Sequence, residues 1–269
     1  MAGEDERAAA RAGVAIRELR EVGEFQQVYR LFDEIWHPKP ANVPASVELM
    51  AGFAHSGNYV AGAFAEGVLV GASVGFLAAG GTLHSHVTGA IIGRGVGYAL
   101  KLHQRAWARE RGLERITWTF DPLVRRNARF NLVKLGARPE EYLTDFYGVM
   151  ADAINEGDAS DRLLAVWPVA GATDAEDGRS GPAYPLVREG ADGRPVVSGG
   201  GGPVLTVGTP RDVERLRREH PEAARAWRTA VRETLGAAMA AGGRVAGFTE
   251  RGEYVVIVNQ LFHRCYGSL

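Results

Sequence analysis

The sequence predicts an α+β fold: a mixed α/β sheet over residues 1–150, followed by a second, smaller α+β domain over residues 151–269. Three observations predict it. Strand and helix patterns follow one another in the order β-α-α-β-β-β-α-β-α-β up to residue 150. A strand, a glycine-rich turn, a helix and another strand succeed one another over residues 82–120, which is typical of a crossover in a mixed sheet. After residue 150 the composition becomes polar and glycine-rich before regular patterns resume.

The composition is that of a globular protein and excludes several functional classes. Hydrophobic residues make up 46% and charged residues 23% of the 269 residues, the formal net charge is −1 and the pI is about 6.7. Such a chain has no basic field for nucleic acid or a membrane surface. The single cysteine, Cys265, allows no internal disulfide, and residues 1–13 lack the apolar core of a signal peptide. No apolar run reaches 18 residues, so we expect a cytoplasmic protein without a spanning helix.

The elements of the first 150 residues are predicted from periodicity and turn residues. Residues 1–13 are expected to form a frayed leader. Glu66-Gly67 predicts a hairpin, and Gly112 and Gly136 stand where two helices are expected to end. The expected strands are 14–19, 59–64, 68–76, 82–92, 114–120 and 142–150, and the expected helices are 24–36, 46–55, 97–111 and 125–135.

The second half is expected to contain an exposed loop or linker at 171–181 and to close with a hairpin over 244–258, and residues 198–203 contain four consecutive glycines. Between them, Thr209 is predicted to cap a helix whose first position is Pro210, and Pro221 to begin a longer helix that ends near residue 241. The arginines of these helices are expected on solvated faces or in surface ion pairs, with carboxylate binding by the second helix as the alternative. They are Arg215, Arg217, Arg218, Arg225, Arg228 and Arg232.

The most informative segment is the glycine-rich turn between a predicted strand and helix. It consists of Gly93, Arg94, Gly95, Val96, Gly97, Tyr98 and Ala99. Backbone N–H groups at a helix N-terminus suit a phosphate or diphosphate, and glycines let the backbone approach it closely. The dinucleotide fingerprint fails because the third glycine is missing, and the P-loop fails because no Gly-Lys-Ser/Thr follows. The alternative is a tight turn that holds no ligand.

Two stretches of sequence resemble the GNAT (GCN5-related) superfamily of N-acyltransferases. The first, from Gly93 to Leu100, is similar to the loop that binds the acyl-CoA pyrophosphate. The second, from Asn127 to Ala137, is similar to a later Asn…Ala…Lys-Leu-Gly-Phe segment. Short stretches at 84–86, 117–122 and 146–148 look like a two-domain predicted-acyltransferase branch. This resemblance covers about the first 150 residues, implies a GNAT-like acyl-CoA N-acyltransferase fold, and continues weakly beyond them.

The resemblance implies a set of residues that bind acetyl-CoA or another acyl-CoA. They are Gly89, Ala90, Ile91, Gly93, Arg94, Gly95, Val96, Gly97, Tyr98, Asn127 and Asn131, with helix capping or solvated positions as the alternative for the two asparagines. Three departures from the superfamily pattern stand out. Ile92 replaces the usual Gln or Arg, the loop before the turn is about three residues shorter, and Leu132 stands where a general-acid tyrosine is frequent.

Four residues are candidates for catalysis: His84, His86, Asp121 and Tyr147. The two histidines lie two apart on one predicted strand, so they share a face, and an imidazole suits proton abstraction near neutral pH. Aligning the superfamily's strand-borne base puts it at His84, with His86 nearly as good. Buried sheet histidines, or a His-x-His metal site without a clear third ligand, are the alternatives, and no metal is expected. Asp121 is read either as an orienting or ammonium-binding group or as a turn residue, and Tyr147 either as a proton donor or as strand packing.

We therefore expect an enzyme that moves an acetyl or succinyl group directly from acyl-CoA to the amine of a small, amino-acid-like metabolite. The alternative is a catalytically silent GNAT-like protein that binds acyl-CoA or a partner. Residues 151–269 are expected to complete the acceptor site or to form a homodimer interface. No nucleic acid or membrane partner is expected.

Overall fold

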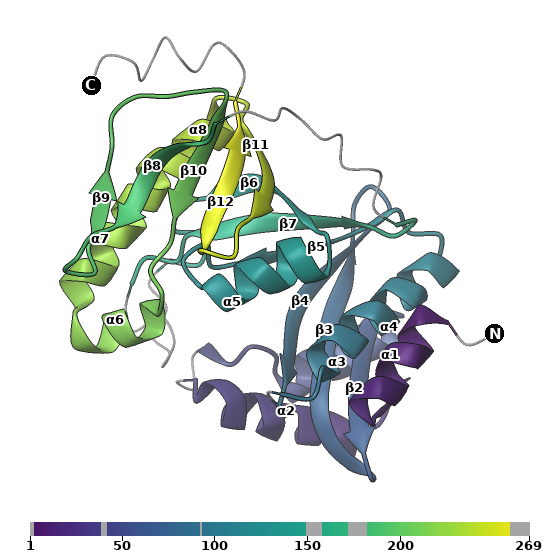
Figure 1. Cartoon of the computed structure of the whole chain (residues 1–269). Helices are drawn as coiled ribbons and strands as arrows, with labels where there is room; N and C mark the ends of the chain where they lie inside the picture. The colour runs from purple at the N-terminus through teal and green to yellow at the C-terminus, as the bar shows by residue number, and fades with distance from the viewer. Residues whose placement is uncertain (1–2, 39–41, 92, 149–157, 172–181, 259–269) are drawn as a thin grey trace. The chain divides into compact units, whose positions relative to one another are not determined.

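The computed structural model describes residues 3–38, 42–91, 93–148, 158–171 and 182–258. Its contacts divide the chain into two compact units: residues 1–118 with 168–171, and residues 119–167 with 172–269. The chain leaves the first unit within one strand, β5 (Arg115–Phe120). Each unit combines helices with strands, so the predicted α+β class is confirmed (Figure 1). The predicted domain boundary at residue 150 stays a prediction.

The first unit is built on a mixed sheet with the strand order β1-β2-β3-β4-β5. Its antiparallel strands are β1 (Ala15–Glu18), β2 (Tyr59–Ala65), β3 (Val68–Ala78) and β4 (Thr82–Ala90). β5 pairs with β4 in parallel, as the predicted crossover requires. The turn between β2 and β3 has positive φ at Glu66 and Gly67 (49° and 82°), which is the geometry of the predicted hairpin.

Helices cover both faces of this sheet. α2 (Val22–Trp36) and α3 (Val47–His55) pack Phe25, Phe32 and Met50 against alternate residues of β3 such as Val74. α4 (Val96–Glu110) covers the other face, where a Cβ at Gly71 would lie 2.8 Å from Val96. Successive strand residues point to opposite faces, so β4 is held between α2 and α4.

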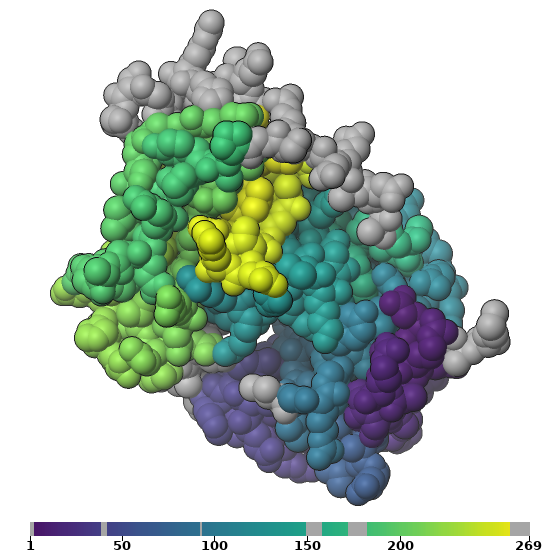
Figure 2. Space-filling model, in the orientation of Figure 1, coloured from purple at the N-terminus to yellow at the C-terminus, as the bar shows by residue number. Residues whose placement is uncertain are grey.

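The first helix overturns the expectation of a frayed leader. α1 (Glu4–Ala12) lies on the surface of the first unit, where it packs along α4 (Figure 2). Ala8 and Ala12 are buried at a spacing of four, and Arg105 of α4 pairs with Glu4 at 2.5 Å. Because α1 packs through small side chains, it contains no large apolar residue, and its sequence pattern does not predict a packed helix.

The second unit contains two sets of paired strands. β6 (Arg138–Leu143) pairs antiparallel with β7 (Arg162–Pro168). A separate five-stranded sheet has the order β11-β12-β10-β8-β9, in which only β8 and β10 run parallel. Its strands are β8 (Tyr184–Glu189), β9 (Pro195–Val197), β10 (Val204–Gly208), β11 (Arg244–Phe248) and β12 (Glu253–Ile257), so the predicted closing hairpin is confirmed.

The helices of the second unit contain two π segments that the sequence did not indicate. α5 (Arg125–Ala128) continues as η2 (Arg129–Lys134). α7 (Pro221–Val231) continues through η3 (Arg232–Gly236) into α8 (Ala237–Ala240), so the predicted long helix is one continuous stretch of helical turns. A separate short helix, α6 (Val213–Glu219), precedes it. π segments insert a residue into an α-helix and are frequent at functional sites.

Two predicted boundaries in this unit were wrong. The strand expected at 142–150 is β6, which begins at Arg138, because Pro139 disguised an edge strand whose pairing shifts register at that residue. The helix expected from Thr209 begins at Val213, because Asp212 is the cap and accepts from the Arg215 N–H at 2.9 Å. Cys265, Ile92 and residues 172–181 of the linker predicted at 171–181 lie outside the described residues.

Candidate functional site

The candidate site begins where β4 and β5 stop pairing. The two strands pair at Thr82, Leu83 and His84 of β4, opposite Arg115, Ile116 and Thr117 of β5. β4 then continues to Ala90, hydrogen-bonded to β3 on its other side. A strand that loses its neighbour presents backbone N–H and C=O groups along that edge.

A bulge in β4 lies two residues beyond this point. Val74 pairs with Val87 and Gly75 with Ser85, so His86 is an extra residue with no partner on β3. Both predicted histidines pack against one ring: the centroid of Phe76 lies 5.0 Å from that of His84 and 6.1 Å from that of His86. The prediction that they share a face is confirmed. Bulges are common beside active sites because they redirect a side chain.

The two histidines differ in their surroundings. His84 is half-buried, and its Nδ1 lies 3.1 Å from Thr117 Oγ1. Burial, with smaller contributions from the charges of His86 and Lys101, lowers the pKa of His84 to about 4. His84 is therefore a neutral imidazole at pH 7, and it is a weaker base than a histidine with the ordinary pKa of 6.5.

His86 is exposed, and one ring nitrogen is committed to the backbone. Its Nε2 lies 2.9 Å from the carbonyl oxygen of Pro44. A carbonyl only accepts, so Nε2 carries the proton and donates. In the neutral ring this leaves the lone pair on Nδ1, and the bond to Pro44 fixes the orientation of the ring.

The glycine-rich turn leads directly from β4 into α4. Gly93 and Gly95 have positive φ values of 107° and 75°, and Gly95 is the N-cap of the helix. Gly97, in the first turn, has no such backbone requirement. A Cβ at any of these three positions would meet nothing within 4 Å. The start of α4 is therefore open, and its first turn carries no acidic side chain that would repel an anion.

The other predicted cofactor residues of the first unit have mixed roles. A Cβ on Gly89 would lie 2.6 Å from Trp36, so packing against α2 already requires this glycine. Ala90 is half-buried beside Gly71, and Ile91 is 52% exposed with its N–H donated to Val70 O. Val96 is buried under the turn, whereas Arg94 is exposed and Tyr98 is half-buried.

A line of buried polar groups behind β4 was not predicted. Lys101 Nζ donates to Ser85 Oγ at 2.8 Å and lies 3.9 Å from the centroid of the Trp118 ring. Gln104 Nε2 donates to Ser73 Oγ at 3.3 Å, and that oxygen lies 2.7 Å from Thr88 Oγ1. Burial lowers the pKa of Lys101 to about 7. Its signal in the sequence was a lysine at a position where the helix pattern calls for an apolar residue.

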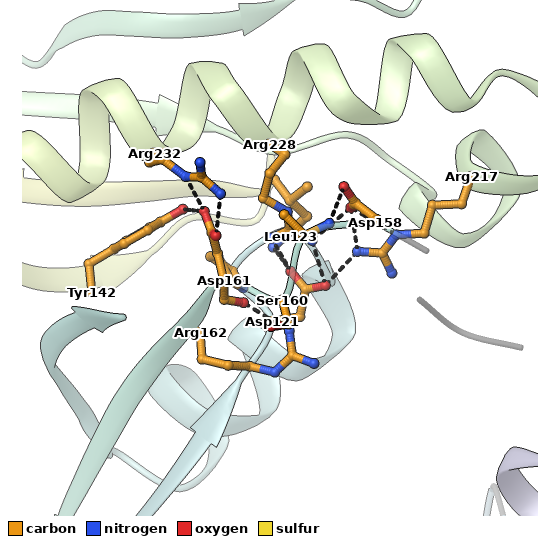
Figure 3. Close-up of polar contacts among 12 residues, drawn as sticks. Asp121, Leu123, Tyr142, Asp158, Ser160, Asp161, Arg162, Arg217, Arg228 and Arg232 are labelled. Atoms are coloured by element: carbon orange, nitrogen blue, oxygen red, sulfur yellow. Dashed lines mark hydrogen bonds and ion pairs between the residues drawn. The ribbon is translucent and has the colours of Figure 1, made fainter. Parts of the chain in front are cut away.

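In the second unit, Asp121 is the centre of a buried ionic network (Figure 3). Arg228 donates to both of its oxygens at 2.9 Å, and Arg217 donates to Oδ2 at 2.6 Å. Asp158 accepts from the same two arginines at 3.0 and 3.2 Å. Burial raises the pKa of Asp121, but the charges of Arg228 and Arg217 outweigh it and hold the pKa well below its usual range. These contacts favour a structural role for Asp121.

A second pair extends the network along the same helical stretch. Arg232 donates to both oxygens of Asp161 at 2.9 and 2.6 Å, and the Tyr142 hydroxyl donates to Oδ2 at 2.7 Å (Figure 3). The expectation that these arginines lie on solvated faces or in surface ion pairs was wrong for Arg217 and Arg228, which are each 3% exposed. Arg228 follows Ala224 by four residues and precedes Val231 by three, so it belongs to the apolar stripe of its helix.

The remaining predicted residues also lie in the second unit. Asn127 is half-buried on α5, and Asn131 is buried in η2. Tyr147 is 44% exposed in a turn, where its hydroxyl lies 2.9 Å from Thr119 Oγ1. Leu132 is half-buried in η2 and offers no proton. The roles of Asn127, Asn131 and Tyr147 stay predictions.

Within the described ranges, no helix has the length and apolar character needed to cross a bilayer. The same part of the chain contains no group of three or more His, Cys, Asp or Glu side chains placed to hold a metal ion.

Several solved acetyltransferases are similar to this chain in structure. A Desulfovibrio desulfuricans protein assigned to the GNAT family is 17% identical, covers 58% of this chain and 99% of its own, and has a TM-score of 0.49. The ribosomal-protein-S18-alanine N-acetyltransferase of Escherichia coli is 15% identical, covers 62% of this chain and 99% of its own, and has a TM-score of 0.47. A Salmonella typhimurium protein assigned as an acetyltransferase was solved with its cofactor acetyl-CoA. It is 14% identical, covers 62% of this chain and 99% of its own, and has a TM-score of 0.48. At these identities and scores, the likenesses assign neither an activity nor a substrate to this chain.

No family model matches the sequence. No curated protein matches it either.

We predict that His84 makes folding sensitive to acid. Its folded pKa lies below the ordinary 6.5, so the unfolded chain binds a proton that the folded chain does not between about pH 4 and 6.5. Stability should therefore fall as pH drops through this window, and His84→Gln should flatten that part of the profile. Urea unfolding at a series of pH values measures it. A ring titration by NMR near 6.5 would contradict the prediction.

We predict that Asp121→Ala destabilises the protein by about 3–5 kcal/mol, because it leaves two buried guanidinium groups without their shared carboxylate. Glu250→Ala is the control, since Glu250 is 93% exposed and its ion pair with Arg129 is 4.0 Å long. Urea unfolding at pH 7 compares the two variants. A similar, small effect of both would show that the network contributes little.

Proposed function

We propose that this chain is an acyl-CoA-dependent N-acyltransferase of the GNAT type, which moves an acetyl or succinyl group to the amine of a small, amino-acid-like metabolite. The observation that carries the proposal is the open glycine turn at the start of α4. Gly97 occupies a helical position where glycine costs stability, yet neither backbone geometry nor packing requires it. Close approach of a ligand to the backbone explains it.

The diphosphate of the acyl donor would lie on the N-H groups at the N-terminus of α4. The first N–H groups of a helix have no partner within the helix, and the helix dipole favours an anion there. The exposed Arg94 adds a positive charge beside the turn. The fit is also steric, because Gly93, Gly95 and Gly97 leave the approach to these amides clear.

The pantetheine arm would follow the unpaired edge of β4. Beyond His84 the strand has lost β5 as a neighbour, and an amide-containing chain can take that place through main-chain hydrogen bonds. Gly89 and Ala90 lie on the part of this edge nearest the turn. The acyl-CoA supplies an activated thioester, and the arm directs that thioester toward the end of the β4–β5 pairing.

His86 is the proposed proton acceptor. Its ring is held by Pro44, and Nδ1 carries the lone pair in the neutral form. The proton of the attacking amine goes to this nitrogen as the new C–N bond forms and the C–S bond breaks. His84 packs against the same Phe76 ring, where it stays uncharged at pH 7 and adds no repulsion to a protonated His86.

Asn127 and Asn131 remain proposed cofactor-binding residues, and Tyr147 remains a proposed catalytic residue. A cytoplasmic location and a homodimer remain part of the proposal. The competing function is binding of acyl-CoA without turnover, which is favoured by Leu132 at the position where the superfamily often has a tyrosine.

We predict that Gly97→Ala has opposite effects on folding and on binding. Alanine should stabilise α4 by roughly 0.5 kcal/mol, while its methyl group should lower the affinity for acetyl-CoA about tenfold. Gly52→Ala in α3 is the matched control, since its Cβ would also meet nothing within 4 Å. It should stabilise the protein without changing affinity. Calorimetric titration and thermal unfolding measure both quantities, and unchanged affinity of Gly97→Ala would contradict the binding site.

Activity is tested by thiol release from acetyl-CoA and succinyl-CoA with a panel of amino acids and small amines. We expect turnover that falls about 10²-fold or more in His86→Gln and less in His84→Gln, with acyl-CoA affinity unchanged in both. Tight binding with no turnover across the panel would favour the binding protein. No binding at millimolar ligand would reject both functions.

A further inference from the structure

Lys101 is a buried cation at the point where β4 and β5 separate. Its Nζ donates to Ser85 Oγ at 2.8 Å and lies 3.9 Å from the ring centroid of Trp118. Ser85 is the first residue of β4 after the last pair with β5, and Trp118 is the first residue of β5 after that pair. The ammonium group therefore contacts one residue of each strand at the first position where they no longer pair.

This cation lacks the partner that buried cations ordinarily have. Lys101 is 5% exposed, and among the described residues no carboxylate is paired with it. Its other contacts are the Gln104 side-chain oxygen at 3.5 Å and the face of Trp118. A buried charge is costly unless it is paired, so the fold retains a destabilising group at this point.

The choice of lysine is itself informative. Only three of the 31 basic residues are lysines, at positions 39, 101 and 134, so the chain uses arginine nearly everywhere else. Arginine stays protonated under all ordinary conditions, whereas a buried lysine loses its proton readily. The pKa of Lys101, lowered to about 7 by burial, agrees with a group that exchanges a proton near neutral pH.

We propose that Lys101 is a catalytic residue that stabilises the departing thiolate of coenzyme A and returns a proton to it. The inference rests on the proposed function and assigns the proton donor that the sequence leaves open at Leu132. A thioester directed along the free edge of β4 would place its sulfur atom beside Ser85 and Trp118, where the Lys101 ammonium lies.

The step balances without any further reactant. The C–S electron pair leaves on sulfur, a proton passes from the Lys101 ammonium to the thiolate, and neutral Lys101 regains a proton from solvent before the next turnover. The proton lost by the amine goes to His86, which releases it to solvent before the next turnover. The sum is one thioester and one amine converted to one amide and one thiol.

The test compares coenzyme A with desulfo-coenzyme A, which lacks only the sulfur. Calorimetry at pH 7.5 should show that the wild type binds coenzyme A at least tenfold more tightly, because only coenzyme A presents a sulfur with which the Lys101 amino group can share a proton. In Lys101→Met the preference should disappear, while the affinity for desulfo-coenzyme A stays within about twofold and kcat falls about 10²-fold. Methionine fills a similar volume without a charge, so the variant should fold, and thermal unfolding verifies it. Lys134→Met, which removes an exposed lysine, should change neither quantity.

Two results would overturn the inference while leaving the proposed function intact. One is equal binding of the two ligands by an active wild type. The other is a Lys101→Met variant that keeps both the preference for sulfur and its turnover within threefold. Failure of the wild type to bind either ligand would instead reject the proposed function, and the role of Lys101 with it.

Discussion

The end of the β4–β5 pairing is the constraint on which the proposed site depends. His84 faces Thr117 in the last pair of the two strands, and Ser85 and Trp118 follow that pair. His86, the residue after Ser85, is the bulged residue of β4. If the ladder continued by two residues, the edge of β4 would be filled by β5 and no chain-like ligand could lie along it. In the proposed function, the glycine turn and the buried lysine contact the same ligand only because the strands separate here.

The main elements of the first unit could be predicted because local signals and tertiary packing agree in them. The hairpin at Glu66-Gly67, the helix stop at Gly112 and the glycine turn before α4 each follow from the conformational freedom of glycine. α1 could not be predicted, because a helix that packs through alanines has the same amino-acid composition as a solvated leader. β6 was misplaced for a related reason: an edge strand tolerates Pro139, which in isolation indicates a loop.

The sequence predicts where the backbone elements of the candidate site lie better than it predicts the charge states of the side chains there. His84, His86 and the glycines were found from spacing, but the lowered pKa of His84 depends on burial that no local pattern reports. Arg228 and Lys101 illustrate the same limit. Each occupies the apolar stripe of a helix. The sequence predicts a surface ion pair for Arg228 and gives no role to Lys101, because only the tertiary structure brings Asp121 to the one and Trp118 to the other.

The bulge at His86 also determines how β4 can change during evolution. Ser85 and Val87 already pair with the adjacent residues Gly75 and Val74, so removal of His86 alone would regularise the ladder and leave every other side chain of β4 on its present face. Removal of any other residue of β4 would instead shift the register and turn the side chains between that residue and the bulge to the opposite face. We expect lineages of this protein to tolerate a one-residue deletion in β4 at position 86 and at no other position of the strand.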